Sequence, residues 1–296
     1  MNTRHLTTLI GRILLYTFAA IGVLFTFVWI GMQFGLFNVR GSIAERNSFF
    51  TDTPSGTSTK TAITVAPCRM ETAVSCAWNA TPEWFVVAGG LEKDVEVIRR
   101  VERETGIPAR QIAAVVVPEQ IRFFTAEREV FKRYFEPLKI LGSLSQFSLG
   151  VSGIKEATAV DIERFALDST SPFYPGPDMA ALFVYPEGSD HDDLLYERLT
   201  DPKDHYYSYL YTALAIKEIE MQWERAGFPI TAEPGIIATL FNIGFAHSKP
   251  HGEPAIGGAA IETGGEAYSF GMLSTLFFRS DELTDLFPHP TAQRAQ

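Results

Sequence analysis

The chain has 296 residues and a formal net charge of -10, from 25 Lys and Arg against 35 Asp and Glu. Residues 1–50 carry four arginines and one glutamate, so the rest of the chain has a formal charge of about -13. This acidic remainder lacks the clustered Lys and Arg that nucleic-acid phosphates demand, which excludes nucleic acid as a partner. The length indicates one or two domains.

Residues 13–39 form a run without charge, longer than the roughly 20 apolar residues that cross a bilayer core. The run is too long for a cleaved signal peptide, and no small-x-small cleavage site follows it closely. We expect an uncleaved transmembrane anchor, preceded by a cytoplasmic tail at residues 1–12. The positive-inside bias is weak and favours a cytoplasmic amino terminus.

Residues 40–80 are expected to be a linker, because the stretch TDTPSGTSTKTA is rich in Ser and Thr and lacks periodicity. Cys68 and Cys76 lie in this region. A pair of cysteines beyond the membrane span suits a disulfide in an oxidising compartment, with two buried free thiols as the alternative. No His lies near them, which argues against zinc.

Residues 81–290 indicate one mainly α domain of the α+β type. Thr81 followed by Pro82 is a helix-start signal, and Gly264-Gly265 predicts a small β-hairpin within 261–270. The expected helical stretches are, in chain order, 84–103, the stretch that follows Pro108, 156–165, 202–226, 234–243 and 271–278.

The stretch after Pro108 contains the first segment of chemical interest. Residues 112–117 are apolar on nearly all sides, which predicts a buried central helix. Pro118 lacks a backbone donor and is expected to kink or end this helix, and Glu119 follows directly. Burial raises the pKa of a carboxyl, and a protonated carboxyl can deliver a proton to a glycosidic oxygen. The alternative is an ordinary exposed helix glutamate.

Two further segments attract attention. SLGVSGIKEATA, residues 148–159, has two glycines that permit close backbone approach to a ligand, or it is a plain loop-to-helix junction. The second segment is ATLFNIG, residues 238–244, in which Asn242 precedes Gly244 near a helix end. Asn242 is a candidate binding residue, and the alternative is that this pair is a helix-capping motif.

Together, Glu119 and these two segments resemble the goose-type lysozyme and lytic transglycosylase superfamily. In that family a catalytic Glu ends a buried helix, and Gly-Leu-Met-Gln-Ile-x-Pro-x-Thr-Ala and Tyr-Asn-Ala-Gly follow. GVSGIKEATA, residues 150–159, aligns with the second motif without gaps, and FNIG, residues 241–244, with the third. Tyr209-Leu210 stands where the family has a Tyr-Leu pair. The resemblance covers roughly residues 108–245.

The departures indicate a divergent subfamily. Gln120 replaces the family's Ser, Gly153 its Gln and Phe241 its Tyr. About 30 residues separate Glu119 from Gly150, more than in many members.

The resemblance implies a lysozyme-like fold and a peptidoglycan-cleaving activity that uses no cofactor or metal, with Glu119 as catalytic acid and base. Glu119 would protonate the MurNAc–GlcNAc glycosidic oxygen and then deprotonate the MurNAc C6 hydroxyl, leaving a 1,6-anhydro product. The substrate contacts implied are Gln120, Ser148, Gly150, Ser152, Gly153, Ile154, Thr158, Tyr209, Phe241 and Asn242. Tyr206 and Tyr207 are further candidates for groove walls, with core packing as the alternative.

Three other functions stay open. A muramidase would need a second carboxylate to activate water. A catalytically inactive glycan-binding or scaffold module is the second alternative. A metal hydrolase has little support, since no HExxH spacing occurs. The candidate second carboxylates are Glu127, Glu129, Glu136 and Asp161, and the histidines considered for a metal are His191, His205, His247 and His251.

The anchor and the implied substrate together predict a single-pass protein of a bacterial inner membrane, with its catalytic domain in the periplasm. Peptidoglycan strands are the expected partner, and a cell-wall or envelope protein complex is a second possible association.

Overall fold

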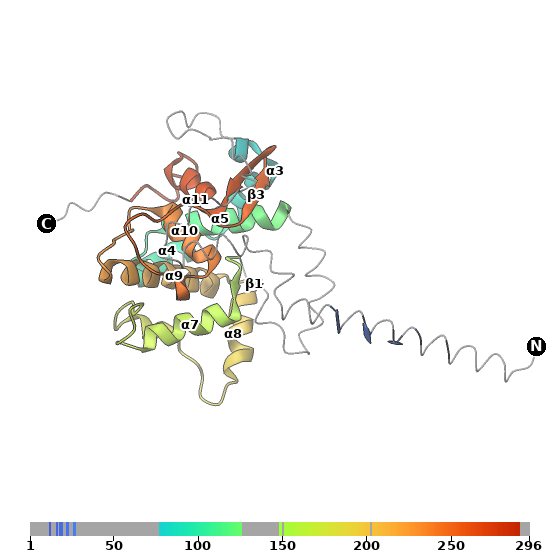
Figure 1. The fold of residues 1–296 in the computed structure, drawn as a ribbon, viewed down its shortest axis with the longest axis vertical. Helices are drawn as coiled ribbons and strands as arrows, with labels where there is room; N and C mark the ends of the chain where they lie inside the picture. Colours follow the sequence, from blue (N-terminus) through green and yellow to red (C-terminus); the bar gives the residue numbers. More distant parts are fainter. Residues whose placement is uncertain are drawn as a thin grey trace, which may run out of the picture.

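The computed structural model describes residues 77–125, 148–149, 151–201 and 203–290, together with isolated helical positions between residues 12 and 27. The predicted linker up to residue 76, with Cys68 and Cys76, and most of the predicted anchor lie outside the described residues. Within the described part, no helix has both the length and the apolar character needed to cross a membrane. The described domain is mainly helical, as predicted (Figure 1).

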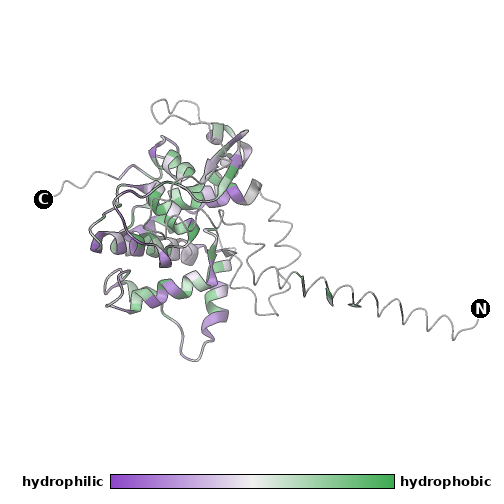
Figure 2. Cartoon of the chain, in the orientation of Figure 1, coloured by the Kyte–Doolittle hydropathy of each residue, from purple (hydrophilic) through white to green (hydrophobic). Residues whose placement is uncertain are grey.

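Helix α5 (Ala109–Thr125) is the central helix of the domain. Residues Ile112 to Val117 are at most 1% exposed, which confirms the buried helix expected from their apolar run. Figure 2 shows hydrophobic residues concentrated around this helix and its neighbours. The elements that pack against α5 are α3 (Pro82–Lys93), α4 (Val95–Thr105), α9 (Tyr206–Arg225), α10 (Pro234–Ile243), α11 (Phe270–Arg279) and β3 (Ala260–Thr263).

Pro118 was expected to kink or end the buried helix. Helix α5 does not end there but continues to Thr125, so Glu119 lies inside the helix. The stretch expected as one helix is two, α3 and α4, separated at Asp94. Thr81 caps α3 as predicted, since its hydroxyl accepts a hydrogen bond from the Trp84 amide at 3.2 Å.

Helix α9 starts at Tyr206, four residues later than its predicted start. The Asp201 carboxylate accepts hydrogen bonds from the backbone of Lys203 and Asp204, which makes this segment a turn. Helices α10 and α11 pack closely at Gly235 and Gly271. A Cβ at Gly271 would overlap the carbonyl oxygen of Gly235, so the close approach requires glycine there.

The predicted hairpin is present as β3 paired antiparallel with β4 (Glu266–Ser269). A second, unexpected hairpin pairs β1 (Ser148–Leu149) with β2 (Ile154–Lys155), immediately before α7 (Glu156–Leu167). Helix α8 (His191–Thr200) was also not predicted, and it packs on α9 and β1. In Figure 1, α7 and α8 lie at the opposite end of the domain from α3. Short 3-10 turns are η2 (Ala77–Ala80), η5 (Met179–Leu182) and η6 (Phe245–His247).

A buried arginine fastens the carboxyl-terminal segment to the central helix. The Arg110 side chain, at the start of α5, donates hydrogen bonds to five backbone carbonyls at and beyond the end of α11. A guanidinium has five N–H donors, so these contacts satisfy a buried cation together with orphan carbonyls at a helix end. The acceptors are the carbonyls of Phe277, Phe278, Ser280, Glu282 and Phe287.

Candidate active site

Glu119 is buried as its position after the apolar run predicts, with 4% of its surface exposed. Its surroundings differ from the expected apolar ones. Arg122 follows one turn later on α5, and its Nη2 donates to Glu119 Oε1 at 2.7 Å and to Oε2 at 2.5 Å. Residues three apart share a helix face, so the spacing itself brings the two side chains together.

The Arg122 guanidinium bears directly on acid chemistry. A general acid delivers its proton and is left as a carboxylate. The contact with Arg122 would stabilise this carboxylate, so the pair can take part in the base half of an acid–base cycle.

The turn between β1 and β2 lies against the Glu119 carboxyl. A Cβ added to Gly153 would overlap Oε1 of Glu119 and would lie 2.5 Å from its Cδ. Gly153 also has φ of +64°, a left-handed conformation that favours glycine. Glycine is thus favoured at position 153 for two reasons, its left-handed φ and the space that the Glu119 carboxyl occupies beside it.

Two polar contacts hold this turn. The amide Nε2 of Gln120 donates to the Val151 carbonyl, which links the turn to α5 beside the acid. Ser152 Oγ donates to the Ser208 carbonyl of α9 at 3.1 Å, and Ser152 is wholly buried. Both side chains were predicted to touch substrate, and both are used by the protein to fix its own backbone.

Asn242 and Phe241 lie in α10, and both are buried. Asn242 Oδ1 accepts a hydrogen bond from the Ala259 amide at 2.9 Å, so its side chain holds the segment before β3. A Cβ at Gly258 would lie 3.0 Å from Asn242 Oδ1 and 3.0 Å from Phe270 Cβ. The Arg122 Cζ lies 5.9 Å from the Phe270 ring centroid, so Phe270 neighbours both the ion pair and the Asn242 segment.

Tyr209 is also buried rather than placed on a groove wall. Its hydroxyl donates to Asp94 Oδ2 at 2.8 Å, and His205 Nδ1 lies 2.5 Å from the same oxygen. Burial alone would raise the pKa of Asp94, but the hydrogen bonds from His205 and Tyr209 outweigh it and leave that pKa lowered. This cluster fixes the break between α3 and α4 to the start of α9.

The other predicted contacts are scattered. Ile154 belongs to the core, and Thr158 is partly exposed in the first turns of α7. Ser148 lies in β1, and Gly150 is outside the described residues. The substrate roles of these residues stay predictions.

A hydrolase would need a second carboxylate, and three of the four candidates lie outside the described residues. They are Glu127, Glu129 and Glu136, within residues 126–147. Asp161 lies on α7, where its carboxylate pairs with Arg164 at 2.7 Å.

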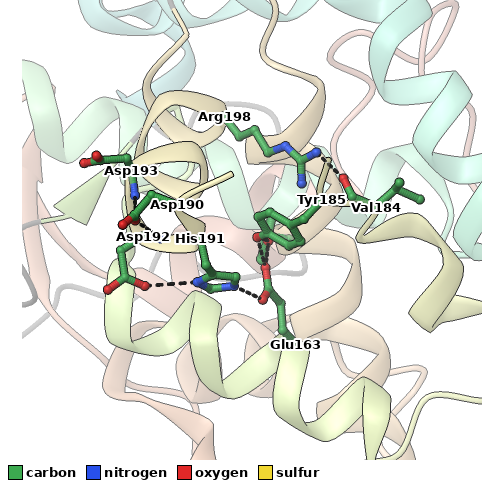
Figure 3. A network of polar contacts seen from close by, with 9 residues as sticks. Glu163, Val184, Tyr185, Asp190, His191, Asp192, Asp193 and Arg198 are labelled. Carbon is green, nitrogen blue, oxygen red and sulfur yellow. Dashed lines mark hydrogen bonds and ion pairs between the residues drawn. The ribbon is translucent and has the colours of Figure 1, made fainter. Parts of the chain in front are cut away.

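A second buried carboxylate, Glu163 on α7, forms the centre of a separate polar network (Figure 3). Its Oε1 accepts hydrogen bonds from the hydroxyls of Tyr185 and Tyr211, and its Oε2 lies 2.7 Å from His191 Nε2. The other ring nitrogen of His191 lies 3.0 Å from Asp192 Oδ1. Since both nitrogens of His191 have carboxylate partners, neither is available to a reacting group.

This network shifts the ionisation of its members. Contacts with Asp192 and Glu163 raise the pKa of His191. Desolvation, followed by the hydrogen bond to Glu163, raises the pKa of Tyr185 to about 12. The network therefore joins α7, α8, α9 and the intervening loop through His191 and two tyrosine hydroxyls.

The described ranges contain no group of three or more His, Cys, Asp or Glu side chains arranged to hold a metal ion. Three of the four histidines considered at the outset lie in separate places, His191 beside Glu163, His205 beside Asp94 and His251 against the Trp223 ring.

The sequence reasoning missed Arg122 and Glu163. Arg122 was detectable, because i and i+3 place it on the face of Glu119. Glu163 was not, since its partners lie 22, 28 and 48 residues away along the chain.

Comparisons with known proteins found no protein similar to this chain. No protein-family model, no curated protein and no solved structure matches the chain.

Proposed function

We propose that the chain is a peptidoglycan-cleaving enzyme of the lytic transglycosylase type, with Glu119 as its acid and base. The contact between Gly153 and the Glu119 carboxyl carries the proposal. It brings together a buried acid and a glycine turn that are far apart in the sequence, and these two segments carry most of the family resemblance. Phe270 neighbours both the Asn242 segment and the same ion pair.

In the proposed reaction, protonated Glu119 delivers its proton to the glycosidic oxygen between MurNAc and GlcNAc. The resulting Glu119 carboxylate then takes the proton of the MurNAc C6 hydroxyl, whose oxygen closes onto C1. The bond from C1 to the leaving oxygen breaks, the bond from C1 to O6 forms, and Glu119 regains its proton. Arg122 supports the carboxylate stage of this cycle. One carboxyl suffices, because the attacking oxygen belongs to the substrate.

The hydrolytic variant would replace the C6 hydroxyl with water and would need a second carboxylate. Asp161 is the one candidate within the described residues, and its pairing with Arg164 gives no preference for that role.

A non-catalytic envelope module is the second candidate function, and one observation favours it. The Arg122 guanidinium contacts both oxygens of Glu119 in a buried ion pair, and such a pair would serve as a structural tie between the two side chains. In that case the domain would bind glycan strands or other envelope proteins without cleaving a bond.

The place of action is part of the same proposal. Residues 13–39 would anchor the chain in a bacterial inner membrane, and the helical domain would reach peptidoglycan strands in the periplasm. Cell-wall or envelope machines at the same membrane are the further partners that this location suggests.

Mass spectrometry of purified peptidoglycan after incubation with the full-length chain tests the reaction class. The proposal predicts fragments that end in 1,6-anhydro-MurNAc. Fragments with reducing ends would show a hydrolase, and intact strands that nevertheless bind the protein would show the non-catalytic module.

A further inference from the structure

The turn at residues 151–153 sets the space around the Glu119 carboxyl. The carboxyl touches the backbone at Gly153 so closely that an added Cβ would overlap it. A small shift of this turn would therefore change where the carboxyl lies. Any side chain that fixes the turn relative to α5 therefore also fixes the position of the Glu119 carboxyl.

Two side chains offer such anchorage, and they do so from different directions. Gln120 is the residue directly after Glu119, and its amide donates to the Val151 carbonyl. Ser152 points the other way and donates to the Ser208 carbonyl of α9. Of these two contacts, the one made by Gln120 joins the turn to the helix that carries the acid.

We propose that Gln120 is a positioning residue that, through the Val151 carbonyl, sets the distance between the 151–153 turn and the Glu119 carboxyl. This inference rests on the proposed function, in which Glu119 transfers the proton. Gln120 itself is partly buried and spends its amide N–H on the protein backbone, so its role is to hold the turn and not to bind the glycan.

Loss of the Gln120 contact is expected to lower the rate of the chemical step more than the affinity for substrate. Proton transfer depends on the placement of the acid, and a displacement of about 1 Å can cost on the order of 100-fold in rate. Substrate binding draws on many contacts along a glycan strand and is less sensitive to one carboxyl.

The test compares Gln120→Met with Gln222→Met in the purified full-length chain, with thermal unfolding as a check on folding. Met keeps the length of Gln and removes the donor. Gln120→Met is expected to lower kcat by about 10- to 100-fold with KM nearly unchanged. The Gln222 amide donates to the Ser248 carbonyl, so Gln222→Met makes the same change at a contact that does not involve the turn, and it should keep kcat close to that of the wild type. Equal losses of kcat in both variants, or none in Gln120→Met, would overturn the inference.

A second readout needs no catalysis. Carbodiimide with an added amine converts an accessible carboxyl to an amide, and mass spectrometry reports the rate at Glu119. The rate is expected to rise severalfold in Gln120→Met and to stay at the wild-type value in Gln222→Met. A wild-type rate in Gln120→Met would disprove the positioning role whether or not the chain cleaves glycan. A faster rate in a chain that cleaves nothing would instead remove the proposed function and keep the link between Gln120 and the turn.

Discussion

The Gly153 backbone lies so close to the Glu119 carboxyl that no side chain fits between them. Glycine is therefore needed at this position for its space as well as for its left-handed φ of +64°. Gly227 offers a comparison, because its φ is +84° and its missing Cβ would have nothing within 4 Å.

Gly153→Ala is expected to destabilise the protein and to displace the acid. Backbone strain and overlap with the carboxyl together predict a loss of about 2–4 kcal/mol in the free energy of unfolding, with cleavage lost as well. Gly227→Ala introduces the backbone strain without any overlap. It should lower the free energy of unfolding by about 1 kcal/mol and leave cleavage unchanged. Urea unfolding and a cleavage assay measure both quantities, and similar behaviour of the two variants would refute the close contact.

The Glu119–Arg122 pair predicts strong energetic coupling. Both side chains are more than nine-tenths buried, so Arg122→Met leaves a carboxylate buried without its cation. The expected loss is about 3–5 kcal/mol in the free energy of unfolding. Adding Glu119→Gln to Arg122→Met should recover much of this loss, because no uncompensated charge is left. Additive effects in this double-mutant cycle would show that the pair is not formed.

Much of the fold follows from local patterns in the sequence. The run of apolar residues from Ile112 to Val117 predicts the buried helix, and Gly264-Gly265 predicts the β3–β4 turn. The break between α3 and α4 does not, because Asp94 owes its place to His205 and Tyr209, more than a hundred residues away. Pro118 does not end α5, since the packing of five helices against α5 outweighs one lost hydrogen bond.

Part of the site also follows from a local pattern in the sequence. Glu119 stands next to a wholly apolar run, which predicts that its carboxyl is buried, and the side chain is buried. The tasks of Ser152, Tyr209 and Asn242 could not be predicted, because each bonds to an element that is distant in the sequence. A motif position indicates a residue type but not the partner that the folded chain brings to it.

The His191 network predicts a pH dependence of stability. Its partners are Glu163 from α7 and Asp192 from its own helix, while Tyr185 and Tyr211 share Glu163. The folded-state pKa of His191 is raised, so its contribution is complete below the unfolded pKa and is lost as pH rises through the folded pKa.

Thermal unfolding across about pH 5 to 8 should therefore show a loss of stability towards higher pH that is reduced in His191→Gln. His289→Gln, at an exposed position, is the control and should keep the wild-type profile. A His191→Gln profile that parallels the wild type would contradict the raised pKa of His191.

Glu218 in α9 predicts a second pH effect. It is wholly buried, and neither carboxyl oxygen has a hydrogen-bond partner among the described residues. Desolvation raises its pKa well above the ordinary value, so the folded state keeps a proton that the unfolded state releases. Stability is consequently lost as pH rises above the unfolded pKa of about 4.3.

Glu218→Met is expected to increase the free energy of unfolding more at pH 7 than at pH 4. Burial also raises the pKa of the neighbouring Glu220 to about 7, which adds a loss in the same direction. The comparison is therefore between variant and wild type at each pH, where the Glu220 contribution cancels. An equal effect of Glu218→Met at both pH values would show that Glu218 does not hold its proton.

The role of Glu119 is tested most directly by the rate at which the full-length chain releases soluble fragments from purified peptidoglycan. Glu119→Gln keeps the shape of the side chain and removes its acid, and Glu218→Gln is a matched change of a buried carboxyl away from the site. The wild type and Glu218→Gln should release fragments at similar rates, and Glu119→Gln should be slower by at least about 100-fold. Release by Glu119→Gln at the wild-type rate would contradict the assignment of the catalytic acid to Glu119.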